Sequence, residues 1–285
     1  MISQTDLFKI FGIAFLFAVA SLHYSALNAW AIEHAIYVKI MVDEEEASTP
    51  EAWKQRLADR LQSASEALYP YSGIRFVPLA YATWDSDDRI RDLSKTLREF
   101  EQEVNPKPAD IAIGFSSQYQ FQSGRNSMGG TRGPMRTHIL LRENARSVYE
   151  PDRLEVLAHE MGHYLGAAHS PSASSVMRPV LADGRARAKA YRISLDDENA
   201  EIVRLVSTEI RKRNIKHYQQ LSPLTLQKLK VLYGQLNRRL PADPAAPIFI
   251  SFVDRLLQAQ AQFRTGTQTI ETLRPIPVYD PNHIP

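Results

Sequence analysis

Three histidines and a glutamate near the middle of the chain have the residue types and spacing of a metal-dependent hydrolytic site. His159 and His163 are four residues apart, so on a helix they share one face and can bind one ion. Glu160 is adjacent and can reach a metal-bound water as a general base. Gly166 can adopt a positive φ, which lets the helix stop and brings His169 back towards the same metal. Three imidazoles suit Zn²⁺ and leave a fourth position open, which is typical of catalytic sites.

The segment H-E-M-G-H-Y-L-G-A-A-H, residues 159–169, resembles the metzincin zinc peptidases and most of all their matrixin branch. Ser170 follows the third histidine, as is common in matrixins, and Met177 stands after a similarly short connection. The resemblance is specific as far as Pro179 and only architectural upstream. It implies a twisted sheet and two helices ahead of the active-site helix, with the apolar side chain of Met177 lying beneath the metal and not binding it.

The resemblance implies a zinc-dependent endopeptidase that hydrolyses peptide bonds through a zinc-activated water, with Glu160 as the general base. The expected cofactor is one catalytic Zn²⁺, and the expected partner is a peptide or protein substrate. An upstream edge strand would pair with the extended substrate backbone. The glycine-rich residues 123–133 are the candidate for that strand, with a plain surface loop as the alternative.

The segment after Met177 helps to wall the specificity pocket in metzincins. Here Arg178 would favour an acidic or polar substrate side chain, because an unpaired charge facing an apolar group is costly. If the arginines of this segment point into solvent instead, Val180 and Leu181 form the pocket. Pro179 stands where astacins and serralysins have a tyrosine, so no tyrosine ligand is expected there.

Two other functions compete with this one. In a gluzincin, a distant glutamate on a later helix is the third ligand, and Glu198 or Glu201 could serve; the spacing of Gly166 and His169 argues against it. An exported zinc-binding interaction protein with weak or no peptidase activity is the second alternative, and the presence of Glu160 disfavours it. His138, in a predicted strand, is interpreted as a core or edge residue.

Composition excludes several classes of protein. The 285 residues are 44% hydrophobic and 23% charged with a formal charge of +2, which is ordinary for a globular protein and gives no sign of nucleic-acid binding. There are no cysteines, so disulfides, thiolate metal sites and latency through a propeptide cysteine are excluded. Nothing in the sequence sets the oligomeric state.

The N-terminus predicts export to the periplasm or the medium. Lys9 precedes an apolar run over residues 10–20, and Ala29-Trp30-Ala31 forms an A-x-A cleavage pattern. The run is too short for a comfortable membrane span, which needs about 20 apolar residues. We therefore expect a signal peptide over residues 1–31 and no stable span in the mature chain. An uncleaved anchor and an ordinary buried helix are the alternatives.

Apolar periodicity predicts an α/β (α+β) fold with a mixed sheet, followed by a mostly helical C-terminal region. Strands are expected over residues 34–42, 74–81, 110–115 and 137–141. Helices are expected over residues 49–68, 85–103, 151–166, 194–213, 223–240 and 247–263. The predicted organisation is a catalytic domain over residues 32–183, a helical region over 184–273 and a Pro-rich tail over 274–285.

Overall fold

A five-stranded sheet forms the centre of the computed structural model, which describes residues 34–118, 128–143 and 148–264. Its strands are β1 (Ala35–Asp43), β2 (Arg75–Trp84), β3 (Ile111–Ser116), β4 (Gly129–Thr131) and β5 (His138–Arg142). They lie in the order β2-β1-β3-β5-β4. Strands β1, β3 and β5 run parallel, and β4 pairs antiparallel with β5 at the edge. This mixed sheet confirms the predicted α/β fold class.

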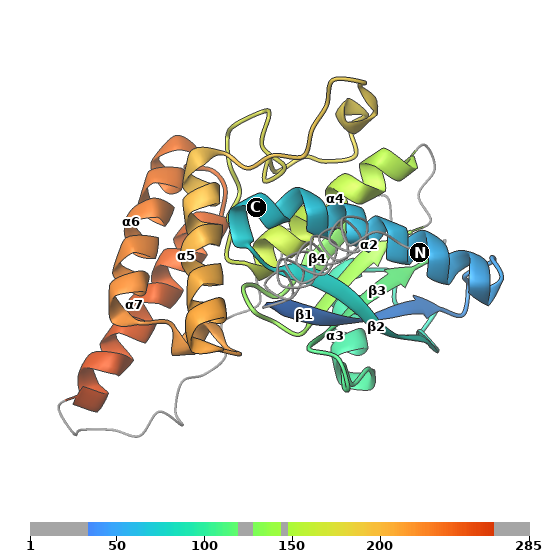
Figure 1. Cartoon of the computed structure of the whole chain (residues 1–285), viewed down its shortest axis with the longest axis horizontal. Coiled ribbons are helices and arrows are strands. Elements are labelled where there is room, and N and C mark those ends of the chain that lie inside the picture. Colours follow the sequence, from blue (N-terminus) through green and yellow to red (C-terminus); the bar gives the residue numbers. More distant parts are fainter. Residues whose placement is uncertain (1–33, 119–127, 144–147, 265–285) are drawn as a thin grey trace, which may run out of the picture. The chain divides into compact units, whose positions relative to one another are not determined.

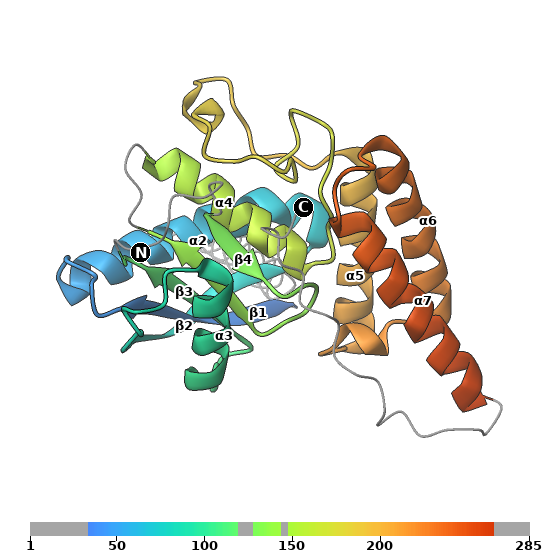
Figure 2. The ribbon, with the colours of Figure 1, turned by 180° about the vertical axis from the view of Figure 1, so that it is seen from behind.

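Helices cover both faces of the sheet. α2 (Pro50–Ser72) and α4 (Glu150–Tyr164) lie on one face and α3 (Leu93–Glu103) on the other (Figure 1); Figure 2 shows the same arrangement from behind. The alternation of side chains along β3 accounts for the two layers. Ile111 and Ile113 pack in the core that includes α2 and α4, whereas Ala112 packs in a smaller cluster with α3.

The predicted helix over residues 85–103 was wrong in its first part, because α3 begins only at Leu93. Asp92 caps the helix, and its side chain accepts a hydrogen bond from a backbone nitrogen of the first turn. Just before it, Asp87 accepts a hydrogen bond from the backbone nitrogen two residues later. Aspartate favours such local bonds over a helix interior, so this acidic segment forms a turn and the helix starts later.

The glycine-rich stretch contains the edge strand. β4 occupies residues 129–131, at the end of the region for which a strand or a plain loop was expected. The earlier part of that region, up to residue 127, lies outside the described residues. Glycine has a low strand propensity. Residues 129–131 therefore form a strand because they pair with β5, and not because their local sequence favours one.

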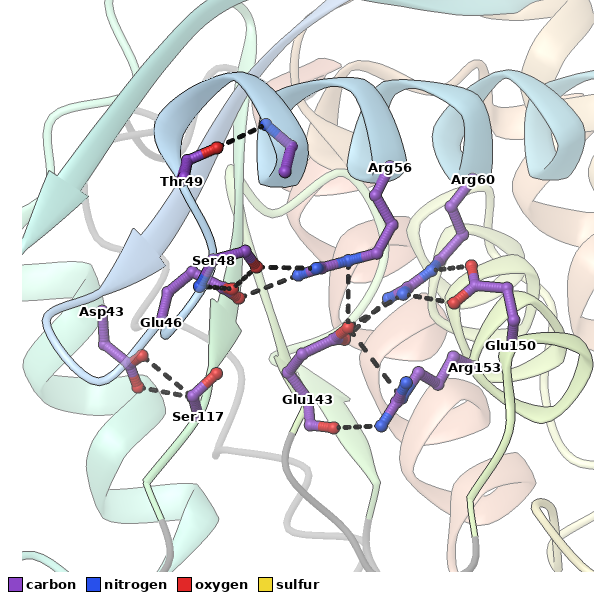
Figure 3. Close-up of polar contacts among 11 residues, drawn as sticks. Asp43, Glu46, Ser48, Thr49, Arg56, Arg60, Ser117, Glu143, Glu150 and Arg153 are labelled. Carbon is purple, nitrogen blue, oxygen red and sulfur yellow. Dashed lines mark hydrogen bonds and ion pairs between the residues drawn. The ribbon is translucent and has the colours of Figure 1, made fainter.

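An ion-pair network centred on the buried Arg60 and Glu143 joins α2 to the elements on either side of residues 144–147 (Figure 3). Arg60 of α2 donates two hydrogen bonds to Glu143, just after β5, at 2.7 and 2.9 Å. It donates two more to Glu150, the first residue of α4, at 2.6 and 2.7 Å. Arg56 and Arg153 form further ion pairs with Glu143. Since an unpaired buried charge is costly, these five side chains favour one placement of α4 relative to α2.

Three long helices complete the described chain. α5 (Asp197–Arg213), α6 (Pro223–Arg239) and α7 (Ala245–Arg264) lie side by side in both views, with the short 3-10 helices η2 (Arg185–Arg187) and η3 (Tyr218–Gln220) between elements. Their buried apolar residues belong to the same core cluster as those of α2 and α4. The mostly helical C-terminal region is therefore confirmed, while its predicted boundary at residue 184 stays a prediction.

None of the helices among the described residues combines the length and the apolar content that a membrane crossing requires. The predicted signal peptide, residues 1–31, and the predicted tail, residues 274–285, lie outside the part of the chain that the structure describes.

Candidate metal centre

Three buried histidines meet at one end of α4. His159 and His163 are on the helix, one turn apart, and His169 follows it after a tight turn. The ligand atoms that the three side chains offer all lie within 4.8 Å of one another. Each side chain is almost fully buried, with 4–7% of its surface exposed. The spacing argument from the sequence predicted this meeting of three imidazoles.

Each imidazole is oriented by a hydrogen bond at Nδ1. His159 Nδ1 lies 2.8 Å from the carbonyl oxygen of Val176, and His163 Nδ1 lies 2.8 Å from that of Ala167. A carbonyl oxygen can only accept, so the proton of each ring sits on Nδ1 and the lone pair sits on Nε2. Two of the rings therefore offer Nε2 as a ligand atom, and this arrangement is typical of metal-binding histidines.

Burial keeps the rings of His159 and His163 neutral, which is the form that binds a metal. It lowers the pKa of His159 to about 3, and the neighbouring His169 ring adds to the effect. It also lowers the pKa of His163 well below the ordinary value, with His159 and His169 contributing. A buried set of neutral nitrogen ligands fits Zn²⁺, which prefers three histidines and an open fourth position in catalytic sites.

Glu160 lies next to the first ligand and is 6% exposed. Burial raises the pKa of its carboxyl group to about 8. A cation held by the three imidazoles would act in the opposite direction, because a nearby positive charge stabilises the carboxylate. The side chain faces the edge strand: a Cβ placed on Gly129 would lie 2.9 Å from both Cγ and Oε1 of Glu160. The backbone of β4 therefore passes directly over the carboxyl group.

The turn after α4 depends on Gly166. Its φ is +95°, a conformation that residues with a side chain rarely adopt. A Cβ there would also lie 3.1 Å from Cγ2 of Val206 on α5. The glycine thus reverses the chain and lets α5 approach closely, and His169 reaches the other two rings as a result.

Met177 lies under the histidine-bearing helix and is fully buried. A Cβ placed on Gly162, which lies between His159 and His163 in the helix, would be 2.6 Å from the Met177 sulfur. Hydrogen bonds hold the backbone on both sides of this side chain: Met177 O accepts from Ser170 N at 2.8 Å, and Met177 N donates to Ser175 Oγ at 3.1 Å. The Met177 side chain therefore packs closely against the backbone of α4 between His159 and His163, and its place beneath a metal stays a prediction.

The residues predicted to shape specificity lie in different environments. Arg178 does not face solvent: it is 5% exposed and pairs with Glu155 of α4 at 2.6 Å and with Asp183 at 3.1 Å. Two carboxylates balance its charge, so the expectation that it selects acidic substrates through an unpaired charge is corrected. Val180 is 66% exposed, and Leu181 is partly buried against the core. Both remain candidates for an apolar pocket.

The alternative ligands lie elsewhere. Glu198 pairs with Arg239, and Glu201 pairs with Arg204. Neither belongs to the histidine group among the described residues. His138 is buried, and its Nε2 lies 2.8 Å from the carbonyl oxygen of Val104, which fits the predicted core role.

One residue of the site was missed by the sequence reasoning. Asp243, in the connection between α6 and α7, places Oδ2 2.8 Å from Nδ1 of His169. Its other oxygen, Oδ1, accepts a hydrogen bond from Ala245 N at the start of α7. In the sequence, Asp243 resembles an ordinary helix cap, and it is 74 residues from His169. No local pattern could connect the two.

The chain is similar to known metallopeptidases in sequence over more than half of its length. A family model described as metallo-peptidase family M12 matches residues 33–201. No curated protein matches the chain. A solved structure titled as a chaperone-substrate complex is 14% identical with a TM-score of 0.42, over 63% of this chain and 35% of that one. Archaemetzincin from Methanopyrus kandleri is 16% identical with a TM-score of 0.38, over 65% of this chain and 97% of that one. This chain thus spans about a third of the first of these two proteins.

Proposed function

Because this chain belongs to metallo-peptidase family M12, we propose that it is a zinc-dependent endopeptidase centred on His159, His163, His169 and Glu160. One observation carries the proposal: three buried imidazoles converge, and each is oriented through Nδ1. Three rings that are held through Nδ1 can turn Nε2 towards one common ion, and Zn²⁺ suits such a set of ligands.

The reaction we propose is hydrolysis of a peptide bond by water. A zinc ion held by the three rings would act as a Lewis acid on the scissile carbonyl and make the attacking water more acidic. Glu160 accepts a proton from that water at a carboxylate oxygen and delivers it to the nitrogen of the leaving amine. The carboxyl group is buried beside the first ligand, so it is close to the reacting atoms and shielded from bulk water.

We propose that the substrate binds in an extended conformation along β4. This strand is at the edge of the sheet, and an extended peptide can add to such an edge through main-chain hydrogen bonds. The close approach of Gly129 to Glu160 supports the proposal, because a peptide aligned with β4 passes near the carboxylate. Val180 and Leu181 are the proposed pocket residues.

Three finer statements are proposed on the sequence alone. The matrixin branch is inferred from Ser170 and from the short connection to Met177. Export through a signal peptide is inferred from residues 1–31. The binding of one zinc ion per chain, with Met177 beneath it, is inferred from the same resemblance.

The test uses the purified full-length chain. We expect stoichiometric zinc, cleavage of a peptide library, loss of cleavage after chelation and recovery on adding zinc. Glu160→Gln should keep its zinc and its thermal midpoint but lose turnover by typically about 10²- to 10⁴-fold, because the proton acceptor is gone. Glu66→Gln, at an exposed position on α2, is the matched control and should cleave normally.

Cleavage that survives complete removal of metal would overturn the zinc mechanism. Near-normal turnover in Glu160→Gln would reassign the general base. Stoichiometric zinc without cleavage of any peptide would favour the zinc-binding interaction protein instead.

A further inference from the structure

The backbone of the turn that carries the third histidine is held by side chains of the C-terminal helices. We call residues 166–169 the third-ligand turn. Tyr233 of α6 donates its hydroxyl hydrogen to the carbonyl oxygen of Gly166 at 2.6 Å. Asn199 of α5 bonds both backbone groups of Ala168, accepting from N and donating to O, each at 2.9 Å. All these groups are buried, so the bonds replace contacts with water that the turn cannot make.

The imidazole of the turn is oriented from the same region. Asp243 is 8% exposed and uses both oxygens: Oδ2 meets His169 Nδ1, and Oδ1 accepts from Ala245 N. The second bond fixes the direction of the carboxylate and also ties it to the start of α7. A carboxylate on Nδ1 holds the proton there, leaves the lone pair on Nε2 and raises the basicity of the ring.

The three ligands differ in how they are held. His159 and His163 sit on a helix, and their Nδ1 partners are carbonyl oxygens of nearby chain segments. His169 is outside any helix, and the partner of its Nδ1 is a side chain 74 residues further on. The third ligand is therefore the one whose position depends on the C-terminal helical region.

We propose that the C-terminal helical region positions the third metal ligand, with Asp243 as the positioning residue for His169. The proposal rests on the proposed function, in that it takes the three histidines as metal ligands. It assigns to α5, α6 and α7 a role in holding the metal, beyond covering the core.

Asp243→Asn is the main test, because it keeps the size of the side chain and removes one acceptor. The single remaining oxygen can serve Ala245 N or His169 Nδ1, and the new NH₂ group opposes the other donor. We expect zinc affinity to fall about 10- to 100-fold in competition titrations with a chelator. The absorption spectrum of the cobalt(II)-substituted protein should also change, because the geometry of the ligand set shifts.

A matched control and a second variant separate positioning from folding. Asp254→Asn removes a carboxylate from α7 that pairs with Lys230 at 2.6 Å, and it should leave zinc affinity and the cobalt spectrum unchanged. Tyr233→Phe removes the hydroxyl bond to Gly166 together with the 2.8 Å bond shared with the Tyr218 hydroxyl, and it should weaken zinc binding by up to about fivefold. The Tyr233 variant provides the measurement if Asp243→Asn fails to fold.

Folded variants at Asp243 and Tyr233 with wild-type zinc affinity and cobalt spectra would overturn the proposal. A loss of zinc affinity in Asp254→Asn as large as the loss in Asp243→Asn would overturn it too, since removing any carboxylate from this region would then weaken zinc binding. The readout is metal binding, so it is independent of catalysis: a wild-type chain that binds zinc but cleaves no peptide would contradict the proposed function and leave the role of Asp243 measurable.

Discussion

Among single residues, the proton on each imidazole decides what the histidine cluster can do. A ring with its proton on Nε2 cannot offer that atom to a metal, and the Nδ1 partners of His159, His163 and His169 favour the other tautomer. Two of these partners are backbone carbonyl oxygens, so no side-chain substitution can remove them. Only the partner of His169 can be altered by mutation.

The two glycines of β4 give a test at the same scale. In Gly129→Ala, the new Cβ would lie 2.9 Å from Cγ and Oε1 of Glu160, so the carboxyl group must move. A displacement of about 1 Å at a reacting group can lower turnover on the order of 10²-fold. We expect Gly129→Ala to lose turnover by a factor of that order while keeping its zinc, as measured by peptide cleavage and metal analysis.

Gly130→Ala is the control for that substitution. Its Cβ would meet only Leu97 on the other face of the sheet, at an ordinary contact distance of 3.7 Å. It should cleave peptides at close to the wild-type rate. Equal turnover in both variants would show that β4 does not constrain Glu160.

Among elements, the placement of α4 rests on charge as well as on apolar packing. Arg60 is buried between Glu143 and Glu150, so it joins α2 to β5 and to the first turn of α4. Burial by itself would raise the pKa of Glu143, but the hydrogen bonds and charge of Arg60 outweigh it and hold that pKa below its ordinary value. The carboxylate form therefore stabilises the folded state.

Glu143→Gln should lower the free energy of unfolding at neutral pH by about 3 kcal/mol, since it leaves a buried guanidinium with one carboxylate partner instead of two. The folded-state pKa is depressed, so this stabilisation is present above the unfolded pKa and is lost as pH falls through the folded pKa. In denaturant titrations, the difference in free energy of unfolding between wild type and variant should become smaller as the pH falls below 4.5, the ordinary pKa of a glutamate.

An exposed ion pair provides the comparison. Glu201→Gln breaks the surface pair with Arg204, and it should cost about 0.5 kcal/mol or less at any pH. If the difference in free energy of unfolding between wild type and Glu143→Gln stayed constant from pH 7 to pH 3, the charge of Glu143 would not stabilise the fold.

For the whole molecule, the C-terminal helices share one core with the sheet and with α4. Ile202 and Val206 of α5 lie against Gly166, and Tyr218 of η3 contacts the same residue. The apolar residues of α6 and α7 belong to the same cluster. The region thus covers the third-ligand turn as well as bonding to it.

A chain that ends at residue 187 should therefore lose its cooperative unfolding transition, because the apolar core beneath α4 would be exposed. Thermal unfolding followed by circular dichroism, together with binding of a hydrophobic dye, would measure this. A truncated chain that unfolds cooperatively and binds zinc with full affinity would identify residues 188–285 as an independent appendage.

The sequence by itself determined whatever depends on short-range spacing. Four residues separate two histidines on one helical face, a glycine permits the turn, and apolar periodicity locates most helices and strands; none of this requires knowledge of distant contacts. The α/β class, the helical C-terminal region and the meeting of His159, His163 and His169 could all be predicted on that basis.

Only the tertiary structure decided the contacts that depend on long-range packing. The partner of His169 is Asp243, Arg178 turns inward to Glu155, and β4 is a strand because β5 lies beside it. Each of these contacts joins segments whose separation along the chain follows no period, so the burial and charge that select them arise only once the core has formed. The role of the last three helices at the metal centre belongs to this second group, because folding brings their side chains to the third-ligand turn.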